Sequence, residues 1–171
     1  MYPKPYLDYL YYFHCARDYF ECHEVLEEYW KEKPAEEREI HWVGFIQIAV
    51  GLYHHRRGNK KGALRMLQNA LTILSNQNSV VESLGLDSLK LKKTLEAYIV
   101  KVENDEPYES LNLPVKNTSL ISLCERKKEV PWGTKSDLTN LYLINKHTLR
   151  DRSEVILERE TRLKRKKNST D

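Results

Sequence analysis

Histidine and glutamate side chains stand at spacings that could bring them together between two neighbouring helices. His23 and Glu27 are four residues apart, so on a helix their side chains can meet. Gln47 and His54 are polar residues in a later segment that is otherwise apolar, and a buried polar group needs a partner. The predicted polar cluster comprises His23, Glu24, Glu27, Gln47 and His54, with His41 as an outlying candidate.

This predicted cluster has two main interpretations, and small-ligand binding is a third. A structural hydrogen-bond network would fix the register of the two helices and rigidify the core. Alternatively, imidazole and carboxylate groups on facing helices could hold a divalent metal with a bound water, as in a metal-dependent hydrolase-like enzyme. The metal candidates are His23, Glu27 and His54. Glu27 stands where an H-E-x-x-H motif would place its second histidine, so no metal or other cofactor is assigned.

Other catalytic motifs are absent from the sequence. It contains neither a glycine-rich phosphate loop nor G-x-S-x-G. Cys22 adjoins His23, but neighbouring side chains on a helix diverge and form no nucleophile–base pair. The sequence therefore favours a non-enzymatic helical scaffold or protein-interaction module over an enzyme.

An all-α bundle of about five helices must position these residues. The expected helices cover residues 6–16, 18–33, 37–57, 60–74 and 87–103. Asp18 and Asp87 are suitable N-caps. The segment 37–57 is apolar almost all round, which is typical of the central helix of a bundle. Gly44 and Gly51 share one stripe of it, where another backbone could approach closely.

The remaining chain suggests an extension to this bundle. Residues 1–104 form the predicted bundle domain, and residues 105–116, which contain two prolines, form a linker. Residues 117–171 are expected to be a helical extension with a basic tail. We expect one short helix near 119–128 and another helical region from about 136 to 166, with a break near Arg150.

Charge is unevenly distributed although the chain of 171 residues has a formal net charge of only +3. Residues 18–39 contain nine acidic and three basic residues, whereas residues 146–167 contain nine basic and four acidic residues. This pattern is typical of ordinary solvated helix faces, and it also suggests self-association or docking onto an anionic partner. The basic tail also suggests nucleic-acid binding as a third hypothesis. This hypothesis is weaker, because no nucleic-acid motif accompanies the tail.

Cysteine usage and hydropathy suggest a location. The three cysteines form no metal-type C-x-x-C pair, and their odd number fits a reducing compartment. The N-terminus lacks the features of a secretion signal, and no apolar run reaches the roughly 18 residues that span a bilayer. We therefore expect a cytoplasmic protein without a membrane partner.

Two resemblances add to this interpretation. The runs FECHEVLEEYW (20–30) and HWVGFIQIAVGLYHHRRGNKKGALRML (41–67) resemble the signature of the bacterial family called domain of unknown function 309. That resemblance implies a small all-helical bundle and supplies no activity, cofactor or partner. The segment 40–74 is also similar to a tetratricopeptide-type helix hairpin, although a single unit falls short of the three that a repeat stack needs.

Overall fold

The computed structural model describes residues 1–125, 129–149 and 153–168, and these are helical without strands, which confirms the predicted all-α class. The bundle comprises α1 (Lys4–Tyr11), α2 (Tyr19–Lys31), α3 (Ile40–Arg56), α4 (Lys60–Ser75), α5 (Asn78–Ser83) and α6 (Ser88–Glu103). Later in the chain follow α7 (Ser119–Glu125), α8 (Leu141–Ile144), α9 (Lys146–Leu149) and α10 (Ser153–Asn168). No helix in the described ranges is both long enough and apolar enough to cross a membrane.

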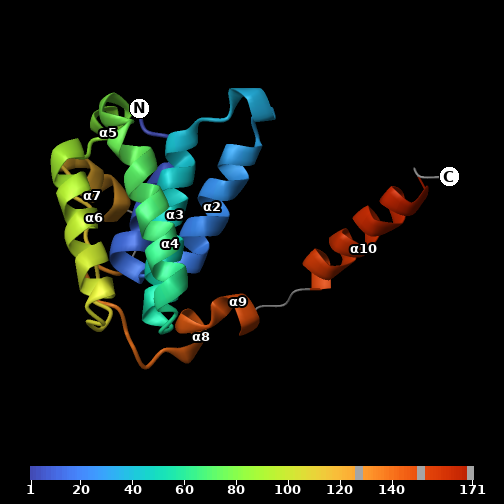
Figure 1. Cartoon of the computed structure of the whole chain (residues 1–171). Coiled ribbons are helices and arrows are strands. Elements are labelled where there is room, and N and C mark those ends of the chain that lie inside the picture. Colours follow the sequence, from blue (N-terminus) through green and yellow to red (C-terminus); the bar gives the residue numbers. More distant parts are fainter. Residues whose placement is uncertain (126–128, 150–152, 169–171) are drawn as a thin grey trace.

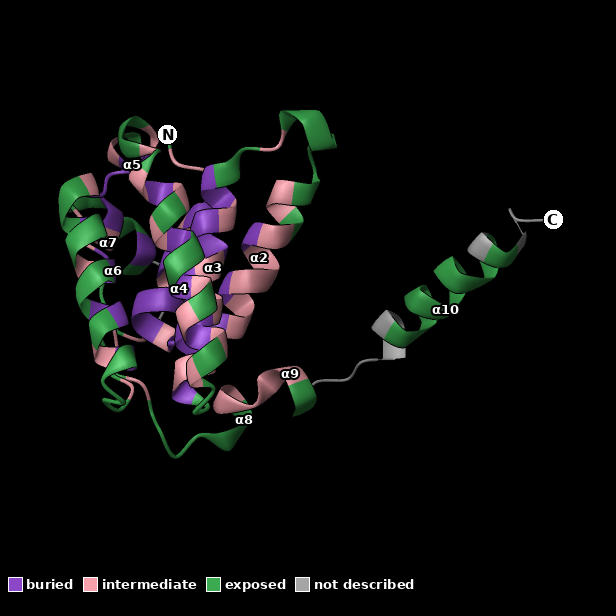
Figure 2. Cartoon of the chain, in the orientation of Figure 1, coloured by how far each residue is buried: buried purple, intermediate pink, exposed green. Residues whose placement is uncertain are grey.

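Helix α3 lies at the centre of the bundle, as its apolar composition predicted. It packs between α2 and α4, and α4 in turn packs against α6 (Figure 1). Figure 2 shows the buried residues concentrated on α3 and on the inner faces of its neighbours. The core includes Phe45, Ile48 and Leu52, none of which exposes any side-chain surface. Burying an aliphatic or aromatic side chain of this size stabilises the fold by about 1.5–3 kcal/mol.

The two glycines of α3 are where α4 approaches most closely. A Cβ atom on Gly44 would lie 2.7 Å from Leu74 Cγ, and one on Gly51 would lie 2.7 Å from Leu67 Cγ. Both distances are too short for two carbon atoms, so the missing side chains allow α3 and α4 to pack in contact. This confirms the expected role of the glycine stripe.

Helix boundaries follow local capping chemistry. The Asp18 carboxylate accepts a hydrogen bond from the Glu21 backbone N–H at the start of α2, and Asp87 does the same for Lys90 at the start of α6. Gly58, with φ of 79°, ends α3 in the left-handed conformation that suits glycine. Asn59 then caps α4 by accepting from the Gly62 N–H.

Some expected boundaries differ from the structure. The polar segment 75–86, expected as a loop, contains the short helix α5, which buries Val81 against the core. The helix expected from about residue 136 begins only at Leu141, because Asp137 first bonds the Thr139 N–H in a turn and Asn140 then caps α8. The expected continuation to residue 128 and the break near Arg150 lie outside the described residues.

Residues 105–125 and 129–149 form a segment that packs on the bundle, with α7 against α1, and ends in α8 and α9; we call it the strap. The buried Arg17 side chain holds it by donating to Thr134 O at 2.7 Å, Leu111 O at 2.6 Å and Asn112 Oδ1 at 2.6 Å. Arg17 is 1% exposed, whereas the acceptor residues Thr134 and Asn112 lie at the surface, so these bonds are partly buried. The predicted division of the chain into a bundle, a linker and an extension stays a prediction.

A second anchor of the strap is the buried His14. Its Nδ1 atom donates to Leu10 O at 2.9 Å, and its Nε2 atom accepts from the Leu113 N–H at 2.9 Å. The Trp132 ring stacks on the imidazole at 3.8 Å between centroids. Both ring nitrogens are therefore used by a neutral imidazole, which fixes its tautomer.

Candidate functional site

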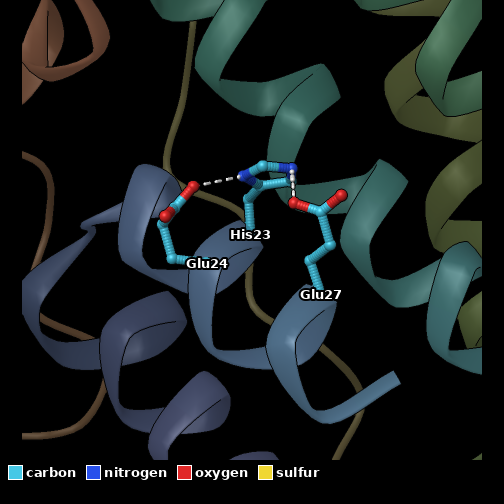
Figure 3. A group of neighbouring side chains, drawn as sticks. All are labelled: His23, Glu24 and Glu27. Carbon is cyan, nitrogen blue, oxygen red and sulfur yellow. Dashed lines mark hydrogen bonds and ion pairs between the residues drawn. The ribbon is translucent and has the colours of Figure 1, made fainter. Parts of the chain in front are cut away.

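Three of the five predicted cluster residues meet on α2. His23 Nδ1 lies 3.0 Å from Glu24 Oε1, and His23 Nε2 lies 3.1 Å from Glu27 Oε2. Figure 3 shows the imidazole ring between the two carboxylates. Lys31 Nζ lies 2.7 Å from Glu27 Oε1, so the group continues along the helix as an ion-paired series.

This His23 group is half-exposed, whereas we expected it in the apolar interior. The side chains of His23, Glu24 and Glu27 are 31%, 37% and 33% exposed. The reason is the rotation of α2: Cys22 and Leu26 face the core and are fully buried, and His23 lies about 100° further round the helix. The group therefore lies at the edge of the bundle.

The two residues expected from α3 behave differently. Gln47 is half-buried, and its Oε1 atom is shielded from solvent without a hydrogen-bond partner among the described residues. His54 accepts a hydrogen bond from Asn59 Nδ2 at 3.2 Å instead of joining the His23 group. Because Asn59 caps α4 through its Oδ1 atom, its amide nitrogen is turned toward His54. Burial, with Arg57 and Arg65 nearby, lowers the pKa of His54.

His41, the outlying candidate, lies apart from both. It is buried at the start of α3, where its ring packs beside Trp42 at 4.4 Å between centroids. Burial lowers the pKa of His41, and Glu39 opposes this effect.

The chemistry open to the His23 group is limited by its own hydrogen bonds. One donor atom from each of His23, Glu24 and Glu27 lies within 4.8 Å of the others, which is close enough to surround a divalent cation. However, both imidazole nitrogens already face carboxylates, so a cation would have to replace one of these contacts. The hydrolase hypothesis also needed His54 as a further ligand, and that side chain bonds to Asn59.

A second polar feature of α2 is an acidic stripe on its outer side. Glu21, Glu24, Glu28 and Glu32 follow one another at steps of three, four and four residues, so they share one face. Lys146 of α9 binds the start of this face, with its Nζ atom 2.7 Å from Asp18 Oδ2 and 2.9 Å from Glu21 Oε1. One residue of the basic C-terminal region therefore contacts the acidic N-terminal region within the same chain.

Comparison with known proteins places the chain in a family. The family model described as domain of unknown function (DUF309) matches residues 6–66. The relative named "Uncharacterized protein YpuF" of Bacillus subtilis (strain 168) is 51% identical over 174 residues, which cover 100% of both chains. The chain belongs to the DUF309 family. No solved structure shows significant similarity to it.

The DUF309 match spans α1 to the middle of α4 and therefore includes the His23 group and the glycine stripe of α3. The resemblance seen in the sequence is confirmed, and the family supplies no activity. The DUF309 region also includes three buried polar residues that sequence reasoning missed: His14, Arg17 and Arg56. Their partners include backbone atoms of the strap, which no side-chain motif could reveal.

Proposed function

We propose that the protein is a non-enzymatic interaction module in which α10 of one copy binds the acidic stripe of α2 in a second copy. The observation that carries this proposal is the exposure of α10. Its apolar residues Ile156, Leu157 and Leu163 are 54%, 65% and 61% exposed. Figure 1 shows α10 lying apart from the bundle. An isolated helix of this length is marginal in water, so a docked state would stabilise it.

Charge supports α2 as the surface that α10 binds. Helix α10 contains six basic and three acidic residues in its sequence, whereas the acidic stripe consists of glutamates. Arg159 and Arg162 are exposed and lie on one side of the face that carries Ile156 and Leu163, which are seven residues apart. Such a helix suits a partner surface that has acidic groups beside apolar ones.

The acidic stripe offers both kinds of group. Glu28 and Glu32 are exposed, while Val25 and Tyr29 beside them are half-buried apolar residues. Lys146 of the same chain already binds the start of the stripe at Glu21, and α10 then extends away from α2 in Figure 1. We therefore assign the rest of the stripe to α10 of a second copy, in the manner of an exchanged arm.

Light scattering of the full chain, compared with a chain that ends at Leu149, tests this proposal. We expect the full chain to form dimers at micromolar concentration and to dissociate as salt screens the ion pairs. The shortened chain should be monomeric and should melt slightly below the full chain, because it loses only the stabilisation that dimer formation adds. A full chain that stays monomeric at all concentrations would contradict the proposal. The proposal would also be contradicted if the full chain were a monomer that binds duplex DNA and the shortened chain did not bind DNA.

A further inference from the structure

Two buried arginines lie where the strap meets the bundle, and neither has a carboxylate partner among the described residues. Arg17 and Arg56 are 1% and 9% exposed. Arg56 Nη1 donates to Arg17 O at 2.7 Å and to Ser136 Oγ at 2.8 Å, and its Nε atom has no hydrogen-bond partner in the described part of the chain. A guanidinium stays charged when buried, so this region holds positive charge in a medium that screens it poorly.

A surface depression of about 320 Å³ is lined in part by Ser136, the residue that Arg56 bonds. Its lining consists of Tyr108, Glu109, Ser110, Lys135, Ser136 and Leu138. The Arg56 guanidinium bonds the Ser136 hydroxyl and lies 5.8 Å from the centre of the Tyr108 ring. The Ser136 hydroxyl in the wall of the depression is therefore polarised by the positive charge of Arg56, which bonds it directly.

The serine hydroxyls of this wall are set to act as donors. Ser110 Oγ accepts from the Ser136 N–H at 2.8 Å, and Ser136 Oγ accepts from Arg56 Nη1 at 2.8 Å. A hydroxyl carries one proton beside its acceptor lone pairs. An acceptor position of each oxygen is thus used by the protein. The Tyr108 hydroxyl lies 3.5 Å from Ser110 Oγ, a distance at which it competes only weakly for the Ser110 proton, so both hydroxyl protons can be donated to a ligand.

The lining contains one acidic and one basic residue, Glu109 and Lys135, and further cations lie next to it. The Glu109 carboxylate is bound by Lys101, with Nζ and Oε2 2.6 Å apart, and this bond lowers the pKa of Glu109. Glu109 therefore stays ionised and has its own cation. Lys135 is a further, exposed cation at the depression. A small anion is recognised by groups of this kind: two hydroxyl donors, an ammonium, and a guanidinium behind the hydroxyls.

We propose that this depression binds a small oxyanion of the phosphate type, held by the hydroxyls of Ser110 and Ser136 and by the Lys135 ammonium. The proposal is independent of α10 and of dimer formation. The volume of the depression lies at the lower end of the range for small-molecule sites, which begins at about 300 Å³. The negative charge of the Glu109 carboxylate would limit how much negative charge a bound ligand can carry.

Titration of the full chain with inorganic phosphate, followed by amide chemical shifts at constant ionic strength, tests the site. We expect saturable shifts at Ser110 and Ser136 with phosphate, and none with chloride. Lys135→Glu should weaken binding about tenfold. The matched control Lys164→Glu makes the same charge change on α10 and should leave the affinity within about twofold. Ser136→Ala should also weaken binding, and Lys135→Glu decides the matter if the alanine variant does not fold.

Three results would overturn the proposal. The first is the absence of saturation at Ser110 and Ser136. The second is an equal loss of affinity in Lys135→Glu and Lys164→Glu, which would mean that phosphate responds to overall charge. The third is saturation by acetate at the same residues with the same affinity, which would reject the phosphate type of ligand.

Discussion

Replacing Arg17 with methionine is expected to lower the free energy of unfolding by about 2–4 kcal/mol, because three acceptors of the strap lose their donor. The guanidinium donates to Thr134 O, Leu111 O and Asn112 Oδ1, and methionine fills a similar volume without donating. Each acceptor that stays buried without a partner costs about 1–3 kcal/mol. Removing a buried charge offsets part of that loss. Urea unfolding monitored by circular dichroism measures the difference.

Two further variants complete the comparison. One separates geometry from charge at Arg17, and the other is a control at the protein surface. Arg17→Lys keeps the positive charge but cannot reach three acceptors that lie in different directions, so it should lose nearly as much stability as Arg17→Met. Arg65→Met, at an exposed position of α4, should change stability by less than about 0.5 kcal/mol. If Arg17→Met were as stable as Arg65→Met, Arg17 would not be an anchor of the strap.

Acidification is expected to destabilise the fold through His14. Burial lowers the pKa of His14 to about 3, the Leu10 carbonyl opposes this, and Arg17 adds to it. In the unfolded chain a histidine has a pKa of about 6.5. Between these two values the unfolded state binds the proton and the folded state does not, so stability is lost as the pH falls below 6.5. The slope for one such group is about 1.4 kcal/mol per pH unit.

The measurement is the free energy of unfolding from about pH 7 to about pH 4.5, over which His14 alone should remove roughly 3 kcal/mol. His14→Gln should be less stable at neutral pH but should show a flatter profile. Burial also lowers the pKa values of His41, His54 and His55, and these residues are present in both proteins, so their contribution cancels in the comparison. Parallel profiles would show that His14 does not control the acid sensitivity.

Sequence reasoning succeeded where the relevant contacts are local or periodic. Residue types at helical spacing predicted three features: the apolar surroundings of α3, the caps Asp18 and Asp87, and the stripe of Gly44 and Gly51. Helix α5 was missed because it is only six residues long and is polar apart from Val80 and Val81. The periodicity of so short a helix is too weak to predict it.

The candidate site was predictable only in part. The contact of His23 with Glu27 follows from their spacing of four residues. The position of His54 depended on Asn59, whose cap at the start of α4 also supplies the donor for the imidazole. Arg17 and Arg56 could not be assigned, because their acceptors include backbone carbonyls 94 and 87 residues away in the sequence. A backbone carbonyl has no residue type that a motif could record.

The contact of Lys146 with Asp18 and Glu21 connects the two parts of the charge pattern. The Lys146 side chain is 14% exposed, so this ion pair is better shielded from solvent than a typical surface pair. It fixes α9 beside the beginning of the acidic stripe. The basic residues of α10 follow directly in the sequence, and the proposed dimer would extend the same electrostatic pairing to a second copy.

Mixing two charge-reversed variants tests the proposed dimer most directly. One variant carries Glu24→Lys and Glu28→Lys on α2, and the other carries Arg159→Glu and Arg162→Glu on α10. Each alone should be monomeric, because α10 and the stripe of another copy then have like charges. In the mixture each α10 meets an oppositely charged stripe, so light scattering should detect a dimer that contains both variants. If both variants dimerise alone, or the mixture stays monomeric while the unaltered chain dimerises, α10 does not bind the acidic stripe of α2.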